Sequence, residues 1–370
     1  MQVFGEKRYN DLNTYLRTHF GTKVYKLALS ASAACPNRDG TCGFGGCIFC
    51  SEGGSGDFAA PLSMCIPEHN FWAKERLKEK LANEYETAKY IAYFQSYTNT
   101  YGDIALLKEK FMQAASDPAI CAVSIGTRPD CVGEDVIAML KEVMESAGKP
   151  VWIELGLQTI HEETARFIRR GYALPVFDDA VKRLRAAGIE VIVHVILGLP
   201  GETAEDMLET VKYVGSSDVQ GIKLQLLHVL EGTELGRMYE RGEVRPAENI
   251  REYECGNMTG DHGGSANTEG YHRLQITDPD LYIDVIIHAL ELLPPHIVIH
   301  RLTGDAPHEK LLFPKWSANK RLTLNGIIRE MKMRDTMQGR LAGKTPTADK
   351  QETGSRKQIS GRTAPCDSSK

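Results

Sequence analysis

The sequence predicts an α/β fold, a partial (β/α)6 TIM-like barrel with a C-terminal α/β extension. Two observations predict it. From Val24 onward, short apolar runs alternate with amphipathic segments, which is typical of βα units around a parallel sheet. Six such units precede a change of composition near residue 248, too few for a closed eight-stranded barrel but enough for an open one. With 370 residues, 42% of them hydrophobic, the chain can bury the large core that this fold requires.

The six predicted strands are Tyr25–Ser30, Tyr90–Gln95, Ala119–Ile125, Val151–Leu157, Glu190–Leu197 and Gly221–Leu227. Between them, apolar residues recur at three- and four-residue spacing, as in Val136, Leu140 and Val143, which is the periodicity of a helix with one buried face. The polar motifs of the sequence follow the ends of these strands. Because the carboxyl ends of barrel strands share one rim, we expect the motifs to meet there and form an active site.

Composition excludes several classes of protein. The net charge of −5 argues against a general polyanion binder, so any contact with nucleic acid is expected to be local. No stretch approaches the ~20 apolar residues of a membrane span, and the sequence has no GxGxxG dinucleotide motif and no P-loop. Nine cysteines without an N-terminal apolar run indicate reduced thiols and a metal site rather than disulfides. We therefore expect a soluble, cytoplasmic protein without membrane contacts.

The most distinctive stretch follows the first predicted strand and reads Cys35-Pro-Asn-Arg-Asp-Gly-Thr-Cys42-Gly-Phe-Gly-Gly-Cys47-Ile-Phe-Cys50. One close pair, Cys47 and Cys50, with the distant Cys35, differs from the two close pairs typical of structural zinc. Three thiolates suit a cubane iron–sulfur cluster that leaves one iron open for a cofactor or substrate. The glycines allow the loop to fold tightly around such a cluster, and Phe49 would shield one face of it from water.

This loop resembles the cluster motif of the radical S-adenosylmethionine (radical SAM) enzymes, and in particular the bacterial YhcC/YtqA-type branch, which is similar to the radical SAM domain of the Elongator catalytic subunit. The resemblance covers about residues 5 to 340. It includes the strings Tyr93-Phe-Gln-Ser-Tyr-Thr-Asn-Thr-Tyr101, Gly126-Thr-Arg-Pro-Asp130, Glu154-Leu-Gly-Leu-Gln-Thr159, His194-Val-Ile-Leu-Gly-Leu-Pro-Gly-Glu-Thr203 and His300-Arg-Leu-Thr-Gly-Asp-Ala306. It implies a partial barrel of the radical SAM type, a [4Fe–4S] cluster held by Cys35, Cys47 and Cys50, and S-adenosylmethionine as cofactor.

The resemblance also implies which residues meet the methionine and ribose parts of the cofactor. One of Gln95, Ser96 and Asn99, after the second strand, is expected to bind the methionine amino group. Glu154 and Gln158, at the end of the fourth strand, are expected to bind ribose hydroxyls or the methionine part. The alternatives are structural: ordinary loop hydrogen bonds for the first three residues, and for Glu154 a buried acid, which is costly unless paired.

Further positions follow from the same resemblance. Arg170 is a candidate for the cofactor carboxylate, with a solvated helix-end charge as its alternative. Gly198 begins a segment that is expected to pack against adenine through its backbone. His194 lies inside the fifth strand, where an interior structural role is expected, whereas His228 lies nearer the rim and is a candidate for substrate contact. No residue is assigned a catalytic role.

Cys42 is a fourth cysteine in a loop that is expected to need three. It is predicted to be a bystander. The alternative is a site of four thiolates, Cys35, Cys42, Cys47 and Cys50, around a cluster or around zinc, and with zinc the protein would be a non-catalytic metal-binding module.

The chain is predicted to divide into four parts: a barrel core with its cluster loop at 1–247, a polar flexible insertion at 248–271, a C-terminal extension at 272–342 and a disordered tail at 343–370. Within the extension, Ile297–His300 is a further predicted strand. Between His296 and Lys344, ten Lys or Arg face four Asp or Glu. Together with Trp316, this basic stripe suits an RNA backbone and an unstacked base; the alternative is a solvated surface with Trp316 in the core.

The reaction is implied by the resemblance. A 5′-deoxyadenosyl radical is expected to abstract a hydrogen atom from the substrate, after reduction of the cluster by a donor such as flavodoxin or ferredoxin. Kinship with the Elongator domain points to the wobble uridine of tRNA, with conversion of 5-carboxymethylaminomethyl-uridine to 5-aminomethyl-uridine as the expected reaction. The alternative within the same family is an enzyme acting on a small metabolite or a protein.

Overall fold

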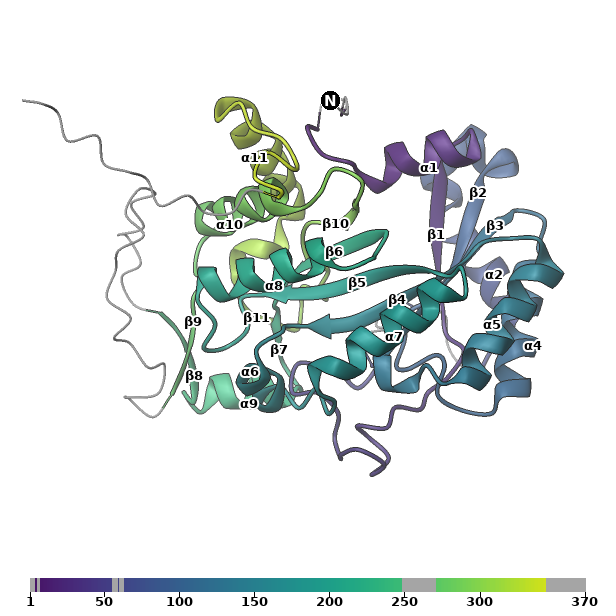
Figure 1. Ribbon diagram of the computed structural model, residues 1–370. Coiled ribbons are helices and arrows are strands. Elements are labelled where there is room, and N and C mark those ends of the chain that lie inside the picture. The colour runs from purple at the N-terminus through teal and green to yellow at the C-terminus, as the bar shows by residue number, and fades with distance from the viewer. Residues whose placement is uncertain (1–3, 5–6, 55–58, 60–62, 248–270, 344–370) are drawn as a thin grey trace, which may run out of the picture.

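A curved sheet of seven parallel strands runs through the computed structural model, in the order β1-β2-β3-β4-β5-β6-β10 (Figure 1). The structure describes residues 4, 7–54, 59, 63–247 and 271–343. The strands are β1 (Val24–Leu29), β2 (Lys89–Phe94), β3 (Ile120–Thr127), β4 (Val151–Gln158), β5 (Glu190–Leu197), β6 (Gly221–Leu226) and β10 (Val298–Arg301). The six predicted strands and the partial-barrel fold are therefore confirmed.

The described helices are α1 (Leu12–Phe20), α2 (Ile66–Glu75), α3 (Lys78–Leu81), α4 (Ile104–Ser116), α5 (Glu134–Ala147), α6 (Glu162–Phe167), α7 (Leu174–Ala186), α8 (Ala204–Ser216), α9 (Glu234–Glu240), α10 (Pro279–Leu292) and α11 (Lys320–Met333), with 3₁₀ helices η1 (Ala82–Thr87), η2 (Pro129–Cys131) and η3 (Lys315–Ala318). Two small sheets complete the described structure: β7 (Val229–Leu230) with β11 (Leu311–Phe313), and β8 (Val244–Pro246) with β9 (His272–Leu274). Helices such as α4, α5, α7 and α8 cover the outer side of the seven-stranded sheet, whereas α9 packs against β7 and β8, and α11 packs on α10 (Figure 1).

The predicted periodicity explains how the helices pack. In α5, Val136, Leu140 and Val143 are buried, and they lie on one face because they are four and three positions apart. Burying one such aliphatic side chain stabilises the fold by roughly 1.5–3 kcal/mol. At the start of α8, the Thr203 hydroxyl accepts a hydrogen bond from the Asp206 N–H, and the Asp206 carboxylate accepts one from the Thr203 N–H. This capping box fixes the turn between β5 and α8, which lies at the rim of the barrel.

The C-terminal extension returns to the barrel and supplies the seventh strand. Strand β10 pairs in parallel with β6, with Val298 opposite Gly221. The N-terminal segment lies against the same strand, because the Ile299 N–H donates to the carbonyl of Asn10 at 2.8 Å. The side chain of Gln338 joins the two ends of the described chain by accepting from the Asn10 N–H at 2.8 Å and donating to the carbonyls of Pro294 and Ile297. The extension is thus part of the barrel wall.

Trp316 belongs to the core and not to an RNA-stacking surface. Its indole N–H donates to the Thr277 carbonyl at 3.0 Å, its ring lies 5.9 Å from that of Tyr282, and it packs against the main hydrophobic cluster. Five cations of the basic stripe are also paired with carboxylates, namely Arg301, Lys320, Arg329, Arg334 and Arg340. The exposed Arg321 and Lys332 on α11 have no ion pair within the described part of the chain. Only part of the stripe is therefore available to a polyanion.

The predicted insertion at 248–271 and the predicted tail at 343–370 lie outside the described residues, apart from Tyr271 and Gly343. None of the described helices is both long and apolar enough to span a bilayer.

Candidate functional site

One cavity of about 860 Å³ opens among the carboxyl ends of the strands. Residues from the cysteine loop and from the ends of four strands, β2, β3, β4 and β6, line it: Cys35, Cys47, Cys50, Gln95, Thr127, Arg128, Gln158, Gln225 and His228. The expected meeting of the polar motifs at one rim is therefore found in the structure. The cavity is within the size range of pockets for small molecules and cofactors.

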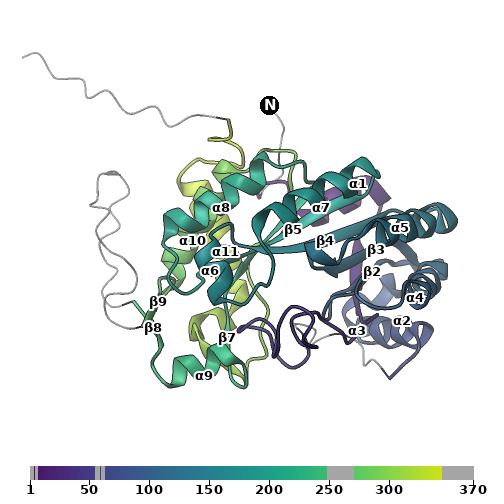
Figure 2. The same cartoon turned by 60° about the horizontal axis from the view of Figure 1, so that its bottom comes forward.

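The cysteine loop, between β1 and α2, crosses this end of the barrel to its far side (Figure 2). There the Ile48 N–H donates to the Ile168 carbonyl at 3.2 Å, and the Ile48 carbonyl accepts from the Leu235 N–H at 2.8 Å. Gly45 and Gly46 have φ values of 76° and 83°, a left-handed conformation that glycine adopts without strain. These turns direct Cys47 and Cys50 into the cavity.

Asn37 fixes Cys47 against the segment after α6. Its side-chain amide donates to the sulfur of Cys47 at 3.4 Å and to the carbonyls of Arg169 and Arg170 at 2.5 and 3.2 Å. Gly171 follows with φ 83°, and a Cβ at this position would lie 2.4 Å from the Asn37 side-chain oxygen. Glycine is thus required at 171 by both conformation and space. Sequence reasoning did not identify Asn37, although it lies within the cysteine motif.

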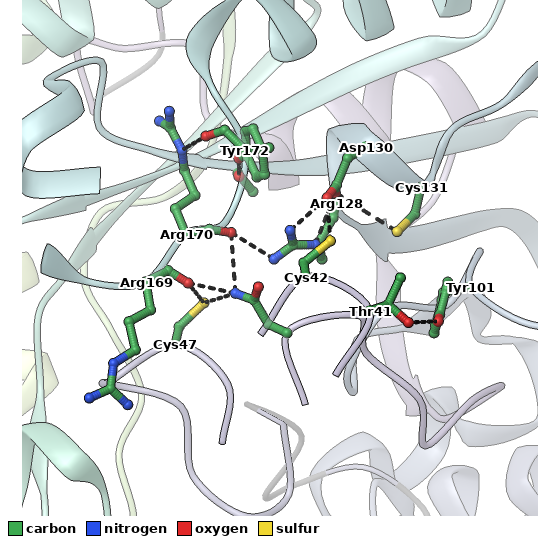
Figure 3. Close-up of polar contacts among 12 residues, drawn as sticks. Thr41, Cys42, Cys47, Tyr101, Arg128, Asp130, Cys131, Arg169, Arg170 and Tyr172 are labelled. Carbon is green, nitrogen blue, oxygen red and sulfur yellow. Dashed lines mark hydrogen bonds and ion pairs between the residues drawn. The ribbon is translucent and has the colours of Figure 1, made fainter. Parts of the chain in front are cut away.

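The thiol arrangement fits a cluster better than a single ion. Cys35, Cys47 and Cys50 line the cavity, but their sulfurs do not all lie within 4.8 Å of one another, since among the described residues only His161, Asp206 and Glu209 form such a group. A single zinc ion binds every thiolate at about 2.3 Å, which keeps the cysteine sulfurs close to one another. The cysteines of an iron–sulfur cube bind different iron atoms, so their sulfurs lie farther apart. Cys42 is exposed and lies instead with its sulfur 3.9 Å from Asp130, away from Cys47 in Figure 3. The structure therefore does not assemble four cysteines around one ion.

Arg128 places a positive charge beside these thiols. Its guanidinium group donates to both carboxylate oxygens of Asp130, at 2.9 and 2.7 Å, and to the Arg170 carbonyl at 2.8 Å (Figure 3). Burial disfavours its charge, but Asp130, with further attraction from Cys47 and Cys35, outweighs burial and raises the pKa of Arg128 above its usual value. A permanent cation next to thiolates stabilises their charged form, which is the form that binds iron. The sequence placed Arg128 in a motif expected at the rim, Gly126–Asp130, but gave it no role.

Of the three candidates after β2, only Gln95 lines the cavity. The hydroxyl of Ser96 is buried and hydrogen-bonded to that of Ser30 at 2.8 Å. Asn99 is fully buried, accepts from the Ala31 N–H at 3.1 Å and donates to the carbonyls of Phe94 and Gly126 at 3.1 and 3.0 Å. Ser96 and Asn99 therefore make the ordinary loop hydrogen bonds that were the alternative expectation. They hold the strand ends together and do not line the cavity.

Arg170 and Gly198 also have structural environments. The Arg170 guanidinium group donates to the carbonyls of Tyr172, Leu157 and Thr159 and pairs with Glu162 at 3.1 Å. These groups engage its charge, but Arg170 also lines the cavity, so the expected contact with a cofactor carboxylate stays a prediction. Gly198 has φ 86° and faces Ile276, whose side chain would lie 3.1 Å from a Cβ at position 198. Gly198 is not among the residues that line the cavity.

Gln158 lies in the cavity wall with φ 69°, a conformation that is uncommon for residues other than glycine. Its side-chain oxygen is buried and has no hydrogen-bond partner among the described atoms. A backbone outlier and an unpaired amide at a cavity wall together indicate a position that a ligand completes.

Glu154 lies deeper, at the centre of a buried ion-pair network. One carboxylate oxygen accepts from Lys26 at 3.0 Å and Ser124 at 2.7 Å; the other accepts from Lys223 and lies 2.7 Å from His194 Nε2. Burial opposes ionisation, but Lys223, Lys26 and His194 outweigh it and hold the pKa of Glu154 well below its usual range. Burial, together with repulsion from Lys223, lowers the pKa of His194 to about 4, so its ring is neutral at neutral pH. His194 is thus paired inside the barrel, as expected, and it also lines the cavity.

Comparison with known proteins agrees with this geometry. The Radical SAM superfamily model matches residues 35–214 and the Radical_SAM C-terminal domain model matches residues 270–333. YtqA of Bacillus subtilis (strain 168) is 40% identical over 335 residues, which cover 90% of this chain and 93% of YtqA. A tRNA uridine(34) acetyltransferase of Methanocaldococcus jannaschii is 32% identical over 128 residues, 34% of this chain and 23% of that protein.

Among solved structures, the archaeal Methanocaldococcus infernus Elp3 has a TM-score of 0.56 at 17% identity, over 85% of this chain and 64% of the Elp3 chain. At this identity the similarity shows the fold alone. Members of the radical SAM family use a [4Fe–4S] cluster and S-adenosylmethionine, and three thiols around one cavity fit the first of these. The chain therefore belongs to the radical SAM superfamily, in the branch that contains YtqA.

Proposed function

We propose that this protein modifies the wobble uridine of tRNA, converting 5-carboxymethylaminomethyl-uridine to 5-aminomethyl-uridine. The observation that carries the proposal is the meeting of Cys35, Cys47 and Cys50 with polar strand ends on one cavity of about 860 Å³, which has room for a cofactor and an extruded base. Similarity to a tRNA uridine(34) acetyltransferase supports tRNA as the substrate class.

The residues of the chain would have the following roles. Cys35, Cys47 and Cys50 hold the cluster, and Asn37 donates to the sulfur of Cys47 and so fixes its direction. Gln95 and Gln158 present amide groups from the cavity wall for the methionine and ribose parts of S-adenosylmethionine. When bound, the cluster and S-adenosylmethionine supply a 5′-deoxyadenosyl radical that abstracts a hydrogen atom, and one S-adenosylmethionine is consumed as the oxidant.

The substrate arm is a CH₂–NH–CH₂–COO⁻ chain on the uracil ring. Its outer methylene has a C–H bond weakened by both nitrogen and carboxylate. Loss of a hydrogen atom there, followed by loss of one electron and the N–H proton, gives a C=N bond. Water then adds to the carbon, the C–N bond breaks, and the products are the free aminomethyl group and glyoxylate. The electron that leaves the arm replaces the one supplied at the start by a donor such as flavodoxin or ferredoxin.

His228 is the candidate for contact with the base. It lines the cavity, and its Nε2 atom has no hydrogen-bond partner among the described atoms. Burial lowers the pKa of His228 to about 4, so the ring is neutral at neutral pH and can donate or accept one hydrogen bond at an uncharged base. Outside the cavity, Arg321 and Lys332 on α11 would meet RNA phosphates.

Mass spectrometry of nucleosides from total tRNA tests this function. Cells with the gene, without it, and with Cys47→Ala are compared, and Cys42→Ala serves as the matched control because Cys42 lies outside the cavity. We expect the carboxymethylaminomethyl nucleoside to accumulate in the deletion and Cys47→Ala strains only. Identical nucleoside profiles in all strains, in a host without a parallel route to the product, would overturn the tRNA assignment and redirect the search to small metabolites or proteins.

A further inference from the structure

The lining of the cavity carries more basic than acidic side chains. Glu154 and Asp305 are the acidic side chains among the described lining residues, and each is shared by two cations. Lys26 and Lys223 both pair with Glu154, and Arg301 and Lys320 both pair with Asp305, at 3.0 and 2.6 Å. Four basic side chains thus face two carboxylates; because burial lowers the pKa of Lys223 well below its usual value, the surplus is two positive charges when Lys223 is charged and one when it is neutral.

Two of these cations have ends that a ligand can reach. The side chains of Lys26 and Arg301 are 23% and 29% exposed, whereas that of Lys223 is 4% exposed. The ammonium groups of Lys26 and Lys223 lie over the same Tyr93 ring, 4.7 and 4.3 Å from its centre. Arg301 lies opposite Lys223 where β10 pairs with β6. The three basic side chains therefore come from neighbouring positions in the barrel interior.

This cluster lies below the rim where the cysteines gather. Lys26 is three residues before Leu29, the last residue of β1, and a strand advances about 3.3 Å per residue, so Lys26 is roughly 10 Å deeper than the strand end. His300 lies beside the cluster in β10, and its Nδ1 atom is buried without a hydrogen-bond partner in the described structure. Buried polar groups are normally paired, so an unpaired one next to surplus cations indicates that a polar ligand completes the site.

We propose that Lys26 and Arg301, backed by Lys223, form a carboxylate-binding subsite at the base of the cavity, which holds the acidic end of the modified base. This inference rests on the proposed function, since the arm of 5-carboxymethylaminomethyl-uridine ends in a carboxylate next to the reactive methylene. Fixing the carboxylate below would leave that methylene pointing toward the rim, where the cysteines and the amides of Gln95 and Gln158 lie. The product arm ends in a primary amine, which is a cation at neutral pH and is repelled by this subsite, and this favours its release.

Binding of two matched RNAs tests the subsite. An anticodon stem-loop carrying the carboxymethylaminomethyl arm and one carrying its neutral carboxamide analogue are titrated anaerobically, by calorimetry, into protein that contains its cluster and S-adenosylmethionine. We expect the wild type to prefer the carboxylate on the order of 10- to 100-fold, because hydrogen bonds to charged groups are worth more than neutral ones. Lys26→Gln and Arg301→Gln should each lower this preference at least about fivefold and leave the carboxamide affinity unchanged.

Lys74→Gln and Arg183→Gln are the control variants. Their side chains are 19% and 27% exposed and paired with carboxylates, as those of Lys26 and Arg301 are, but they lie outside this cavity. They should retain the full preference. The affinity for S-adenosylmethionine, measured without RNA, should be unchanged in all four variants; if it falls in Lys26→Gln and Arg301→Gln while the RNA preference persists, the cations bind the methionine carboxylate and the proposal is wrong.

The outcomes separate the subsite from the reaction. A wild type with no preference for the carboxylate, or variants that lose affinity for both RNAs equally, would overturn the subsite even if the enzyme converts the nucleoside. Conversely, a carboxylate preference that disappears in Lys26→Gln and Arg301→Gln supports the subsite even if the enzyme does not convert the nucleoside. In that case only the proposed reaction is wrong.

Discussion

The ammonium group of Lys26 lies 3.0 Å from the carboxylate of Glu154, although the two residues are 128 positions apart in the chain. The contact crosses the barrel interior from β1 to β4. It exists because β1 to β6 curve around one space, which brings the middle of each strand close to the middle of the others (Figure 1). The charged interior is therefore a consequence of barrel curvature.

Removing the buried partner of Glu154 should destabilise the fold strongly. In Lys223→Met the fully buried Glu154 keeps Lys26 and His194 but loses its most buried cation, and breaking a buried pair costs about 3–5 kcal/mol. Lys74→Met, which breaks the partly exposed pair with Asp117, should cost no more than about 1 kcal/mol. Urea titrations measure the free energy of unfolding of both variants. Equal losses would show that the buried network around Glu154 contributes no more to stability than the pair of Lys74 with Asp117.

Gly171→Ala should damage the cysteine loop. The new Cβ would lie 2.4 Å from the Asn37 side-chain oxygen, at φ 83°, so Asn37 must move away from Cys47. We expect reduced iron content and a loss of more than about 2 kcal/mol in stability. Gly148→Ala is the control, since it has φ 61° but nothing within 4 Å, and it should cost only about 1–2 kcal/mol with normal iron content. Normal iron content in Gly171→Ala would contradict the role given to Asn37.

Glu202 should make stability depend on pH. Burial raises the pKa of Glu202 to about 7, although hydrogen bonds from Thr159 and Thr164 act to lower it. The folded state holds this proton more tightly than the unfolded chain, whose glutamate has the usual pKa of 4.5, so the stabilisation is complete below pH 4.5 and is lost as the pH rises through about 7. Glu202→Gln, which is always uncharged, should be the more stable protein at about pH 8, by up to roughly 3 kcal/mol, with little difference near pH 4. The exposed neighbour Glu205→Gln should show no such divergence in parallel urea titrations.

Arg321 and Lys332 should contribute to RNA affinity through phosphate contacts. Replacing both with Gln should weaken tRNA binding several-fold, equally for different tRNAs, and reduce the slope of log affinity against log salt by about 1 to 2. Lys182→Gln, an exposed cation on α7, should change neither quantity. An unchanged salt slope in the double variant would place the RNA on another face.

Much of the barrel was predictable from sequence because its signals are local. Alternating apolar runs and helical periodicity identified the six strands, and the rule that barrel strands share a carboxyl rim correctly brought Gln95, Gln158 and His228 to one cavity. The strand predicted at Ile297–His300 exists as β10, but the sequence did not indicate that it joins the barrel next to β6, because pairing between distant strands leaves no local pattern.

The pairing of the buried charges inside the barrel could not be predicted from sequence for the same reason. Lys26, Glu154 and Lys223 each interrupt an apolar strand, and a charge inside a buried strand signals a partner. The sequence does not say which charges meet, because that depends on the curvature of the sheet. Ser96 and Asn99 were candidates for cofactor contact because the family resemblance expects such a contact after the second strand, yet their side chains bond to neighbouring backbone and hydroxyl groups. Short polar side chains serve either purpose, and only coordinates distinguish them.

The most direct measurement is the product balance of a single reaction. Purified protein with its cluster restored is incubated anaerobically with a reductant, S-adenosylmethionine and tRNA that carries 5-carboxymethylaminomethyl-uridine, and 5′-deoxyadenosine, 5-aminomethyl-uridine and glyoxylate are quantified together. The account predicts equal amounts of the three, and none of them with Cys47→Ala. Formation of 5′-deoxyadenosine without any change in the tRNA would contradict the proposed substrate.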